Sequence, residues 1–259
     1  MIYIGIPARN ERHTIGPLLW RIRELLLRRS RDFQVVVVDD ASTDGTGESL
    51  LPYQRVLPLT VLRNETREGY AASLERLVRE VVQRSDYLKR DALVTLQADF
   101  TNAPEDIPEL VRRFEGGADL VVALTRSEGV APHRVRLATA GARLVGRFMP
   151  RPEGIEDTLG SFRLYRLFTL ARAIADLPDR DTRLLSHEGW AANAELLLRV
   201  LPHVRRSEQI ESRLDYTRRY RDSRLRVLSE LRGLGGVSRD RRLREIERNA
   251  AMPVQEGTR

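Results

Sequence analysis

The segment Phe33–Asp40 reads FQVVVVDD, a run of β-branched residues that ends in two carboxylates. A continuous apolar run of this kind is typical of a strand that is buried on both faces of a parallel sheet. Outward from it, strand-like and helix-like patterns alternate from residue 1 to about residue 125. This alternation predicts an α/β fold, with a mostly parallel central sheet flanked by helices.

Strands are expected at residues 2–6, 33–38, 59–63, 92–96 and 119–124. Helices are expected at residues 13–29, 47–51, 70–83, 104–114, 132–149 and 188–200, and a loop at 154–163. After residue 225 the pattern becomes basic and helical. We therefore predict one domain over residues 1–228, followed by a basic helical tail over residues 229–259.

The composition of the 259 residues excludes several classes of protein. Hydrophobic residues are 41% of the chain, which is enough for a core. No cysteine is present, so disulfides, zinc–thiolate sites, iron–sulfur centres and cysteine nucleophiles are excluded. No apolar run approaches the roughly 18–20 residues of a membrane span, and Met1–Pro7 reads as a strand, not as a signal peptide. We expect a soluble, cytoplasmic chain that can also sit peripherally at the inner face of the membrane.

Positive charge is concentrated near the end of the chain. The net charge is +7, and the stretch Arg218–Arg248 holds 11 arginines and 5 acidic residues. A basic tail on a near-neutral body indicates an anionic partner. The tail also carries an apolar stripe, which either lies on an anionic membrane surface or packs on the body: Leu225, Val227, Leu228, Leu231 and Leu234. A nucleic-acid partner is not expected, because no recognition helix and no interleaved aromatic residues accompany the charge.

Three polar clusters follow predicted strands: residues 7–11 (PARNE), Asp39-Asp40 and Gln97–Asp99. Ligands bind at the carboxyl ends of strands in parallel sheets, so the three clusters predict one site. The pair Asp39-Asp40 either accepts hydrogen bonds from a nucleobase or ribose, or caps the next helix. Residues 42–44 can do that capping instead.

Asp99 is a candidate ligand for Mg²⁺ or Mn²⁺, because these ions prefer oxygen donors and Mg²⁺ needs few carboxylates when phosphates complete its shell. The alternative is an N-cap before Pro104. Scattered arginines are surface residues when taken singly, but together they can bind phosphate in forked contacts: Arg126, Arg134, Arg136, Arg163, Arg218, Arg219, Arg221 and Arg224. The four histidines have no metal-binding spacing.

In this order and spacing, Ile6–Glu11, Val37–Thr46 and Gln97–Asp99 resemble the inverting family 2 glycosyltransferases, which have the GT-A fold. The later segment Asp157–Arg166 is similar to the Asp-x-x-Ser-Gly-Phe-Arg stretch of the dolichol- and polyprenol-phosphate sugar synthases. Glu195–Leu197 resembles a helix of that group, and Arg218–Leu225 its terminal basic loop. The resemblance covers about residues 2–228.

The resemblance implies a GDP- or UDP-linked sugar donor, a polyprenyl-phosphate acceptor and a divalent cation, Mg²⁺ or Mn²⁺. It implies a role for each of several residues. Pro7, Ala8 and Glu11 would line the nucleoside pocket. Asp40, or as second choice Asp39, would meet the base, with Arg67 nearby. Gln97, Ala98 and Asp99 would bind the nucleotide sugar, and Asp99 with Gln97 would hold the metal that bridges the diphosphate. Phosphates of donor and acceptor would meet Arg126, Arg136, Arg163, Arg218, Arg219, Arg221 and Arg224.

The implied reaction is glycosyl transfer with inversion, with Asp99 and Arg163 as catalytic residues. An acceptor phosphate is already anionic and needs no strong base, whereas a hydroxyl acceptor needs a carboxylate to take its proton. Asp157 and Glu195 are the candidates for that base. Three positions depart from the family pattern: Gln97 replaces an acid, Thr101 a frequent glutamine, and Gly160-Ser161 reverses the usual order. Rival readings are a transferase with a soluble or polysaccharide acceptor, and a binding protein without catalysis.

Overall fold

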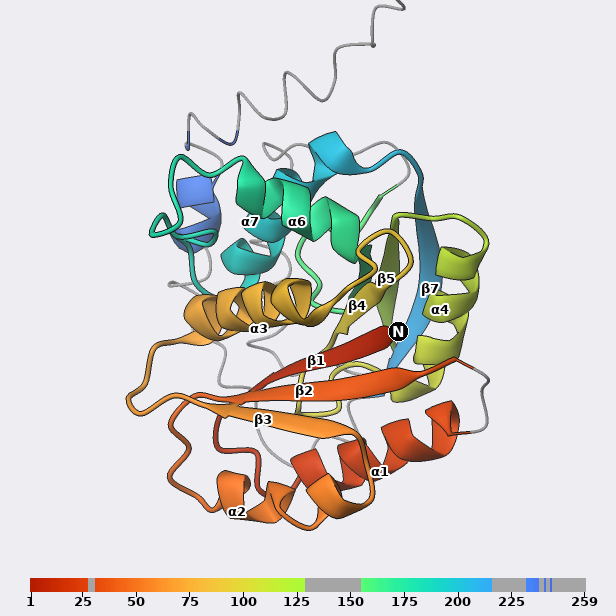
Figure 1. Cartoon of the computed structure of the whole chain (residues 1–259), viewed down its shortest axis with the longest axis vertical. Coiled ribbons are helices and arrows are strands. Elements are labelled where there is room, and N and C mark those ends of the chain that lie inside the picture. The colour runs from red at the N-terminus through yellow and green to blue at the C-terminus, as the bar shows by residue number, and fades with distance from the viewer. Residues whose placement is uncertain (28–30, 129–154, 216–231, 238–239, 241–242, 244–259) are drawn as a thin grey trace, which may run out of the picture.

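A computed structural model describes residues 1–27, 31–128, 155–215, 232–237, 240 and 243. Seven strands form one sheet with helices on both faces (Figure 1). The strands are β1 (Ile2–Ala8), β2 (Phe33–Asp39), β3 (Leu59–Arg63), β4 (Ala92–Thr95), β5 (Leu120–Glu128), β6 (Arg163–Arg166) and β7 (Ser207–Asp215). The α-helices are α1 (Ile15–Leu26), α2 (Thr46–Leu50), α3 (Tyr70–Arg84), α4 (Ile107–Glu115), α6 (Leu167–Ala175) and α7 (Trp190–Val200). Short 3-10 helices are η1 (Tyr53–Arg55), η2 (Pro104–Asp106) and η3 (Leu201–His203).

The strand order in the sheet is β3-β2-β1-β4-β6-β5-β7. β6 runs antiparallel to both of its neighbours, and the other pairs of neighbouring strands are parallel. The predicted mostly parallel α/β sheet is thus confirmed. β4 and β5 follow each other along the chain, but β6 lies between them and joins β5 and β7 to the rest of the sheet.

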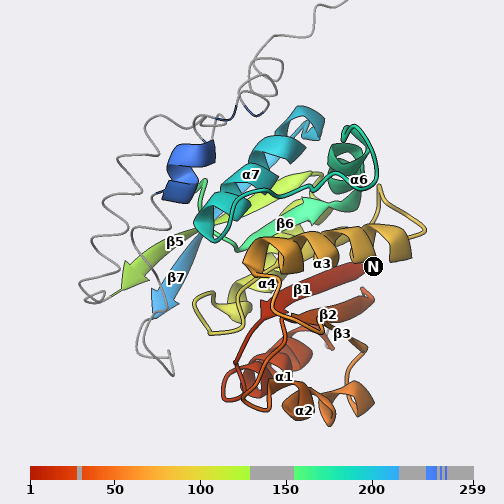
Figure 2. The same ribbon diagram turned by 90° about the vertical axis from the view of Figure 1, so that its left-hand side faces the viewer.

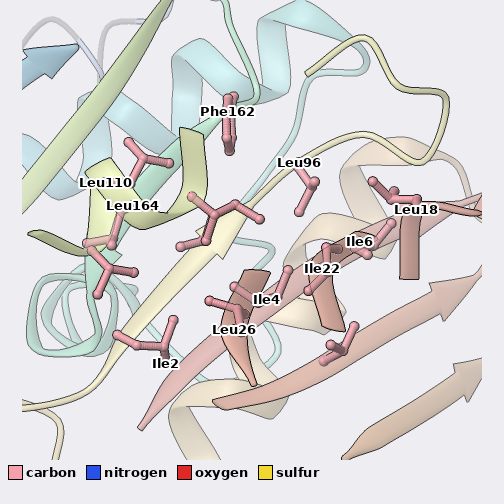
Figure 3. Close-up of a cluster of buried hydrophobic side chains, with 14 of the residues drawn as sticks. Ile2, Ile4, Ile6, Leu18, Ile22, Leu26, Leu96, Leu110, Phe162 and Leu164 are labelled. Carbon is pink, nitrogen blue, oxygen red and sulfur yellow. The ribbon is translucent and has the colours of Figure 1, made fainter. Parts of the chain in front are cut away.

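The sheet has an apolar core on each face. On one face, Ile2, Ile4 and Ile6 of β1 pack against α1 and α4 (Figure 3). On the other face, the sheet packs against α3, α6 and α7. Side chains of β2 alternate between the two cores, and all four valines of residues 35–38 are 0% exposed. The prediction of a strand buried on both faces is confirmed for β2.

The predicted elements up to residue 124 match the structure within a few residues at their ends. The pattern did not predict β6, α6 or β7 as elements. β6 reads RLYR and β7 reads SEQIESRLD, so charged side chains mask the strand pattern in both. The helix expected at 132–149 lies outside the described residues, as does most of the predicted tail. No helix in the described part of the chain is both long and apolar enough to cross a membrane.

One part of the predicted tail is described. Residues 232–237 are helical and lie beside α7, as both views show (Figure 2). Leu234 and Val237 pack there with Leu243 against Ala191 and Ala194 of α7. Leu234 is fully buried in this contact. The apolar stripe was expected either to lie on a membrane surface or to pack on the body, and Leu234 packs on the body. Residues 225–231 of the stripe lie outside the described residues.

Candidate functional site

The carboxyl ends of β2, β1 and β4 lie side by side at one edge of the sheet, because these strands are parallel neighbours. Backbone hydrogen bonds continue past the paired residues. The Asp40 N–H donates to the Ala8 carbonyl (2.9 Å), and the Leu96 N–H donates to the Gly5 carbonyl (3.1 Å). The segments that carry Asp40 and Asp99 therefore leave the sheet at the same edge, where ligands bind in α/β folds.

The backbone at this edge is strained. Three non-glycine residues of the described chain have a left-handed backbone: Asn10 (φ 53°), Ala41 (φ 49°) and Phe100 (φ 58°). Each of them lies in the segment that follows one of these three strands. Such conformations cost roughly 1–3 kcal/mol each and concentrate at functional sites. The strain thus coincides with the predicted site.

The turn after β1 is bonded to the turn after β2. The Asn10 N–H donates to Ser42 Oγ, and the Glu11 N–H donates to Thr46 Oγ1, both over 2.8 Å. The Glu11 carboxylate also accepts a hydrogen bond from the Thr14 hydroxyl. Of the residues predicted to line a nucleoside pocket, Pro7 and Ala8 end β1 and Glu11 belongs to this pair of turns. Arg67 is exposed in the loop before α3.

The two neighbouring carboxylates of the Asp39-Asp40 pair have different partners. Asp40 is 4% exposed and accepts hydrogen bonds from Asn64 Nδ2, the Glu68 N–H and the Gly69 N–H. The Oδ1 atom of Asp39 accepts one from the Ser42 N–H (3.1 Å). The Oδ2 atom of Asp39 is buried and has no hydrogen-bond partner among the described residues. Asp40 thus holds the 64–69 loop, and Asp39, which is 0% exposed, keeps one oxygen without a hydrogen-bond partner among the described residues.

That buried oxygen faces a cation. The Nε atom of Arg63 lies 3.8 Å from Asp39 Oδ2, too far for a hydrogen bond, and Arg63 is itself exposed. Buried polar atoms are paired in the great majority of cases, so an exception calls for an explanation. A ligand N–H at this position would satisfy the oxygen.

The turn after β4 carries Gln97, Ala98 and Asp99. Asn102 Oδ1 accepts the Gln97 N–H (3.0 Å) and closes this turn. Asp99 Oδ1 accepts hydrogen bonds from the N–H and the hydroxyl of Thr101. The carboxylate of Asp99 is partly exposed, so it is fixed in place and still accessible to a ligand.

The loop of residues 157–162 lies next to that turn, because β6 pairs with β4 and begins where β4 ends. Thr95 Oγ1 donates to the Ser161 carbonyl (2.6 Å), and Ser161 Oγ donates to Asn102 Oδ1 (3.4 Å). The carboxylate of Asp157 accepts the N–H groups of Leu159 and Gly160, which shapes the loop from within.

Arg163 is fully buried at the base of this loop. Its guanidinium donates to the carbonyls of Asn193 (2.7 Å) and Asp157 (3.3 Å) and to the hydroxyl of Tyr165. No carboxylate lies within ion-pair distance of it among the described residues. These contacts clamp the loop to α7. The Nε atom of Arg163 is buried and has no hydrogen-bond partner among the described residues, and its predicted phosphate contact stays a prediction.

Glu195 is also fully buried. It accepts hydrogen bonds from the N–H groups of Ser186 and His187, from His187 Nδ1 and from the Arg199 guanidinium. Burial raises the pKa of Glu195, but the hydrogen bonds from His187, Ser186 and Arg199 outweigh burial and lower it below its usual value. A carboxylate so placed stays ionised and cannot reach an acceptor hydroxyl, so the structure favours a structural role over that of general base.

His187 provides a prediction about pH. The hydrogen bond to Glu195 raises the pKa of His187, against the opposing effect of burial. A group whose pKa is higher in the folded state stabilises the fold fully at pH values below its pKa in the unfolded state. This stabilisation is lost as the pH rises through its pKa in the folded state. The difference in unfolding free energy between wild type and His187→Ala should therefore be larger at pH 5.5 than at pH 9, measured by urea denaturation. Asp240 and Arg199 also face the imidazole and oppose each other in charge. Equal differences at both pH values would contradict the assignment.

Several predicted residues lie outside the described residues. They are the phosphate-binding candidates Arg136, Arg218, Arg219, Arg221 and Arg224, together with Arg134. Arg126 belongs to β5, but its side chain is not among those described. Other residues at the site were missed by the sequence analysis, since nothing in their local pattern marks them: Tyr70, Asn102, Glu188 and Asn193. Their part in the site arises from contacts between segments far apart in the chain.

Comparisons with known proteins show which proteins this chain is similar to. Over 166 residues the chain is 29% identical to a dolichol-phosphate mannosyltransferase of Pyrococcus furiosus, covering 62% of this chain and 45% of the relative. It is 26% identical to an undecaprenyl-phosphate 4-deoxy-4-formamido-L-arabinose transferase of Edwardsiella ictaluri, covering 70% and 53%. The chain thus spans about half the length of these curated relatives.

Among solved structures, glucosyl-3-phosphoglycerate synthase from Mycobacterium tuberculosis is similar in fold. In its complex with Mn²⁺, uridine diphosphate and glucosyl-3-phosphoglycerate, it has a TM-score of 0.58 and 19% identity, covering 98% of this chain and 81% of the synthase. The predicted GT-A fold is confirmed. The model of the family described as glycosyl transferase family 2 matches residues 3–172. The chain therefore belongs to glycosyl transferase family 2.

Proposed function

We propose that this chain transfers a sugar, with inversion, from a nucleoside-diphosphate sugar to a polyprenyl phosphate. The observation that carries the proposal is the order of groups along one edge of the sheet. Asp39 ends β2, Asp99 follows β4, and the 157–162 loop precedes β6, in the sheet order β2-β1-β4-β6. An extended donor laid along this edge has its base at β2, its diphosphate at β4 and its sugar facing the loop.

The base end of the donor is assigned to Asp39. Its buried Oδ2 atom is one available acceptor, which matches the single imide N–H of uracil. Guanine presents two neighbouring N–H donors, and the second would have to share Oδ1 with the Ser42 N–H, whereas a single donor can take the unshared Oδ2. We therefore propose a UDP-linked donor over a GDP-linked one. The similar synthase from Mycobacterium tuberculosis is also described in complex with uridine diphosphate, which supports this choice.

The diphosphate end is assigned to Asp99 and Gln97 with a divalent cation. No group of three or more His, Cys, Asp or Glu in the described part of the chain could hold a metal by itself. Mg²⁺ needs only one or two carboxylates when substrate phosphates supply further oxygens, so these residues fit a cation that binds together with the donor. Such a cation stabilises charge on the departing diphosphate. The complex of the similar synthase with uridine diphosphate also contains Mn²⁺, which supports this assignment.

A phosphate acceptor is favoured over a hydroxyl by the state of the two candidate bases. The Oδ1 atom of Asp157 already accepts two N–H groups of its own loop, and Glu195 is fully buried. An acceptor that arrives ionised needs neither of them. The names of the two curated relatives, which concern dolichol phosphate and undecaprenyl phosphate, support this choice. A transfer assay that compares polyprenyl phosphate with soluble sugars separates this proposal from a hydroxyl acceptor.

The basic tail is proposed to contact the membrane that carries such an acceptor, through its arginines. Arg218–Arg248 supplies the positive charge for anionic lipid headgroups. Failure of the chain to sediment with acidic vesicles at low salt would refute this contact. The non-catalytic alternative is favoured by one feature, Gln97 in place of an acid. Donor hydrolysis that responds to Mn²⁺ would exclude it.

Nucleotide binding is the direct test of the donor assignment. UDP with Mn²⁺, at about 100 times its Kd, is expected to raise the melting temperature by about 5–10 °C, and GDP by less. In Asp39→Asn, the amide oxygen can still accept the Ser42 N–H, but an NH₂ group, which donates, replaces the unpartnered Oδ2 atom. The rise in melting temperature with UDP should therefore largely vanish. The matched control is Asp32→Asn at the other end of β2, which should keep the shift. A full UDP shift in Asp39→Asn would overturn the assignment.

A further inference from the structure

The 157–162 loop is held between two buried amide side chains. Asn102 and Asn193 are each 3% exposed. Asn102 lies at the end of the turn that carries Asp99, and its Oδ1 atom accepts both the Gln97 N–H and Ser161 Oγ. The diphosphate end of the proposed donor site is thereby tied to one side of the loop.

Asn193, on α7, holds the other side of the loop. Its Nδ2 donates to the Leu159 carbonyl (3.1 Å), and its Oδ1 accepts the Tyr70 hydroxyl (2.7 Å). Its backbone carbonyl also accepts the buried guanidinium of Arg163 (2.7 Å). One residue therefore joins α3, the loop and β6, three segments that are far apart in the chain.

Tyr70 is in turn fixed to the base end of the proposed donor site. It is the first residue of α3, and the start of this helix is occupied by two carboxylates. Asp40 accepts the N–H groups of Glu68 and Gly69, while Glu188 accepts those of Tyr70 and Ala71. The helix start that carries Tyr70 is thus anchored to the carboxylate next to Asp39.

We propose that Asn193 is a positioning residue that sets the 157–162 loop at a fixed distance from the bound donor, so that an acceptor held by the loop meets the sugar. The proposal rests on the proposed function. The loop faces the end of the donor that is opposite the base, because β6 and β2 lie on opposite sides of β1 and β4 in the sheet order. Asn193 touches the loop backbone and not the donor turns, so its loss should affect transfer and spare donor binding.

The test compares two fates of the same donor, namely transfer to polyprenyl phosphate and hydrolysis by water. A shift of about 1 Å in a reacting group costs on the order of 100-fold in rate. Asn193→Ala should lower transfer by about 10- to 100-fold and leave donor hydrolysis and the UDP melting shift within about twofold. Tyr70→Phe removes only the hydroxyl and should cause a smaller loss in the same direction. Because the two groups share one hydrogen bond, the double variant should lose less than the product of the single losses.

The matched control is Thr169→Ala on α6. Its hydroxyl is buried and donates to the Arg166 carbonyl (2.8 Å), away from the loop, so the variant also loses a buried hydrogen bond. It should leave the ratio of transfer to hydrolysis unchanged. If Asn193→Ala keeps the wild-type ratio of transfer to hydrolysis, the positioning role is refuted. The proposed function still stands in that case, provided that the wild-type protein transfers sugar to polyprenyl phosphate. A wild type that neither binds UDP nor transfers sugar would overturn both.

Discussion

Asp99→Ala is expected to lose at least about 1000-fold in the rate of sugar transfer, while its melting temperature without ligand stays close to that of wild type. Asp99 is the one carboxylate of its turn, because Gln97 and Thr101 are neutral. In the variant, this turn has no anionic group for a cation at the diphosphate. Charge on the departing nucleoside diphosphate would then be left without its main stabilisation. Transfer assays with and without Mn²⁺ measure this loss.

The control for this prediction is Asp179→Ala. Asp179 accepts the N–H and hydroxyl of Thr182 and the N–H of Asp181, much as Asp99 accepts those of Thr101. Its turn lies against the C-terminal half of α3, because Arg79 donates to the Thr182 carbonyl. The proposed site lies at the other end of that helix. Asp179→Ala should transfer sugar at the wild-type rate, and wild-type turnover in Asp99→Ala would refute the metal assignment.

The second large effect is on stability, at Glu195. Its removal leaves the guanidinium of Arg199, the imidazole of His187 and two backbone N–H groups without their acceptor. Breaking a buried ion pair by deleting one partner typically costs about 3–5 kcal/mol. Glu195→Ala should therefore lower the unfolding free energy by about that amount, measured by urea denaturation at pH 7.

Glu80→Ala is the matched control for Glu195. Glu80 and Arg84 form a pair with the same spacing of four residues, but on the exposed face of α3. Exposed helix pairs contribute about 0.3–0.5 kcal/mol, so this variant should remain close to wild type. If the unfolding free energy falls by the same small amount in both variants, the buried contacts of the Glu195 carboxylate do not stabilise the fold as expected.

The elements before residue 125 could be predicted because their apolar periods are clear. The central strand β2 shows this best, since four consecutive valines required cores on both faces, and both cores are present. The short strand β6 could not be predicted in the same way. Two of its four residues are arginines. The sheet accommodates Arg163 because carbonyls of α7 and of the preceding loop accept hydrogen bonds from its guanidinium.

The gathering of the three polar segments at one edge of the sheet could be predicted, but the contacts that each of their residues makes could not. Neighbouring side chains of a strand point to opposite faces, so Asp39 and Asp40 necessarily meet different partners. Which of them remains available depends on the 64–69 loop, whose N–H groups Asp40 accepts. Likewise, charged residues such as Arg163 and Glu195 read as surface groups in a sequence. Nothing local reveals that Arg163 lies against α7, or that the backbone N–H groups of residues 186–187 donate to Glu195.

The position of β6 has a consequence for how the chain is made. As a ribosome synthesises the protein, β4 and β5 emerge long before the four residues that pair with both. Until residue 166 has left the exit tunnel, the growing chain therefore displays an open, apolar strand edge at β4, the kind of surface that recruits unrelated chains. Sheet completion is a late event that depends on pairing between distant segments, which slows folding and gives chaperones a defined interval in which to act.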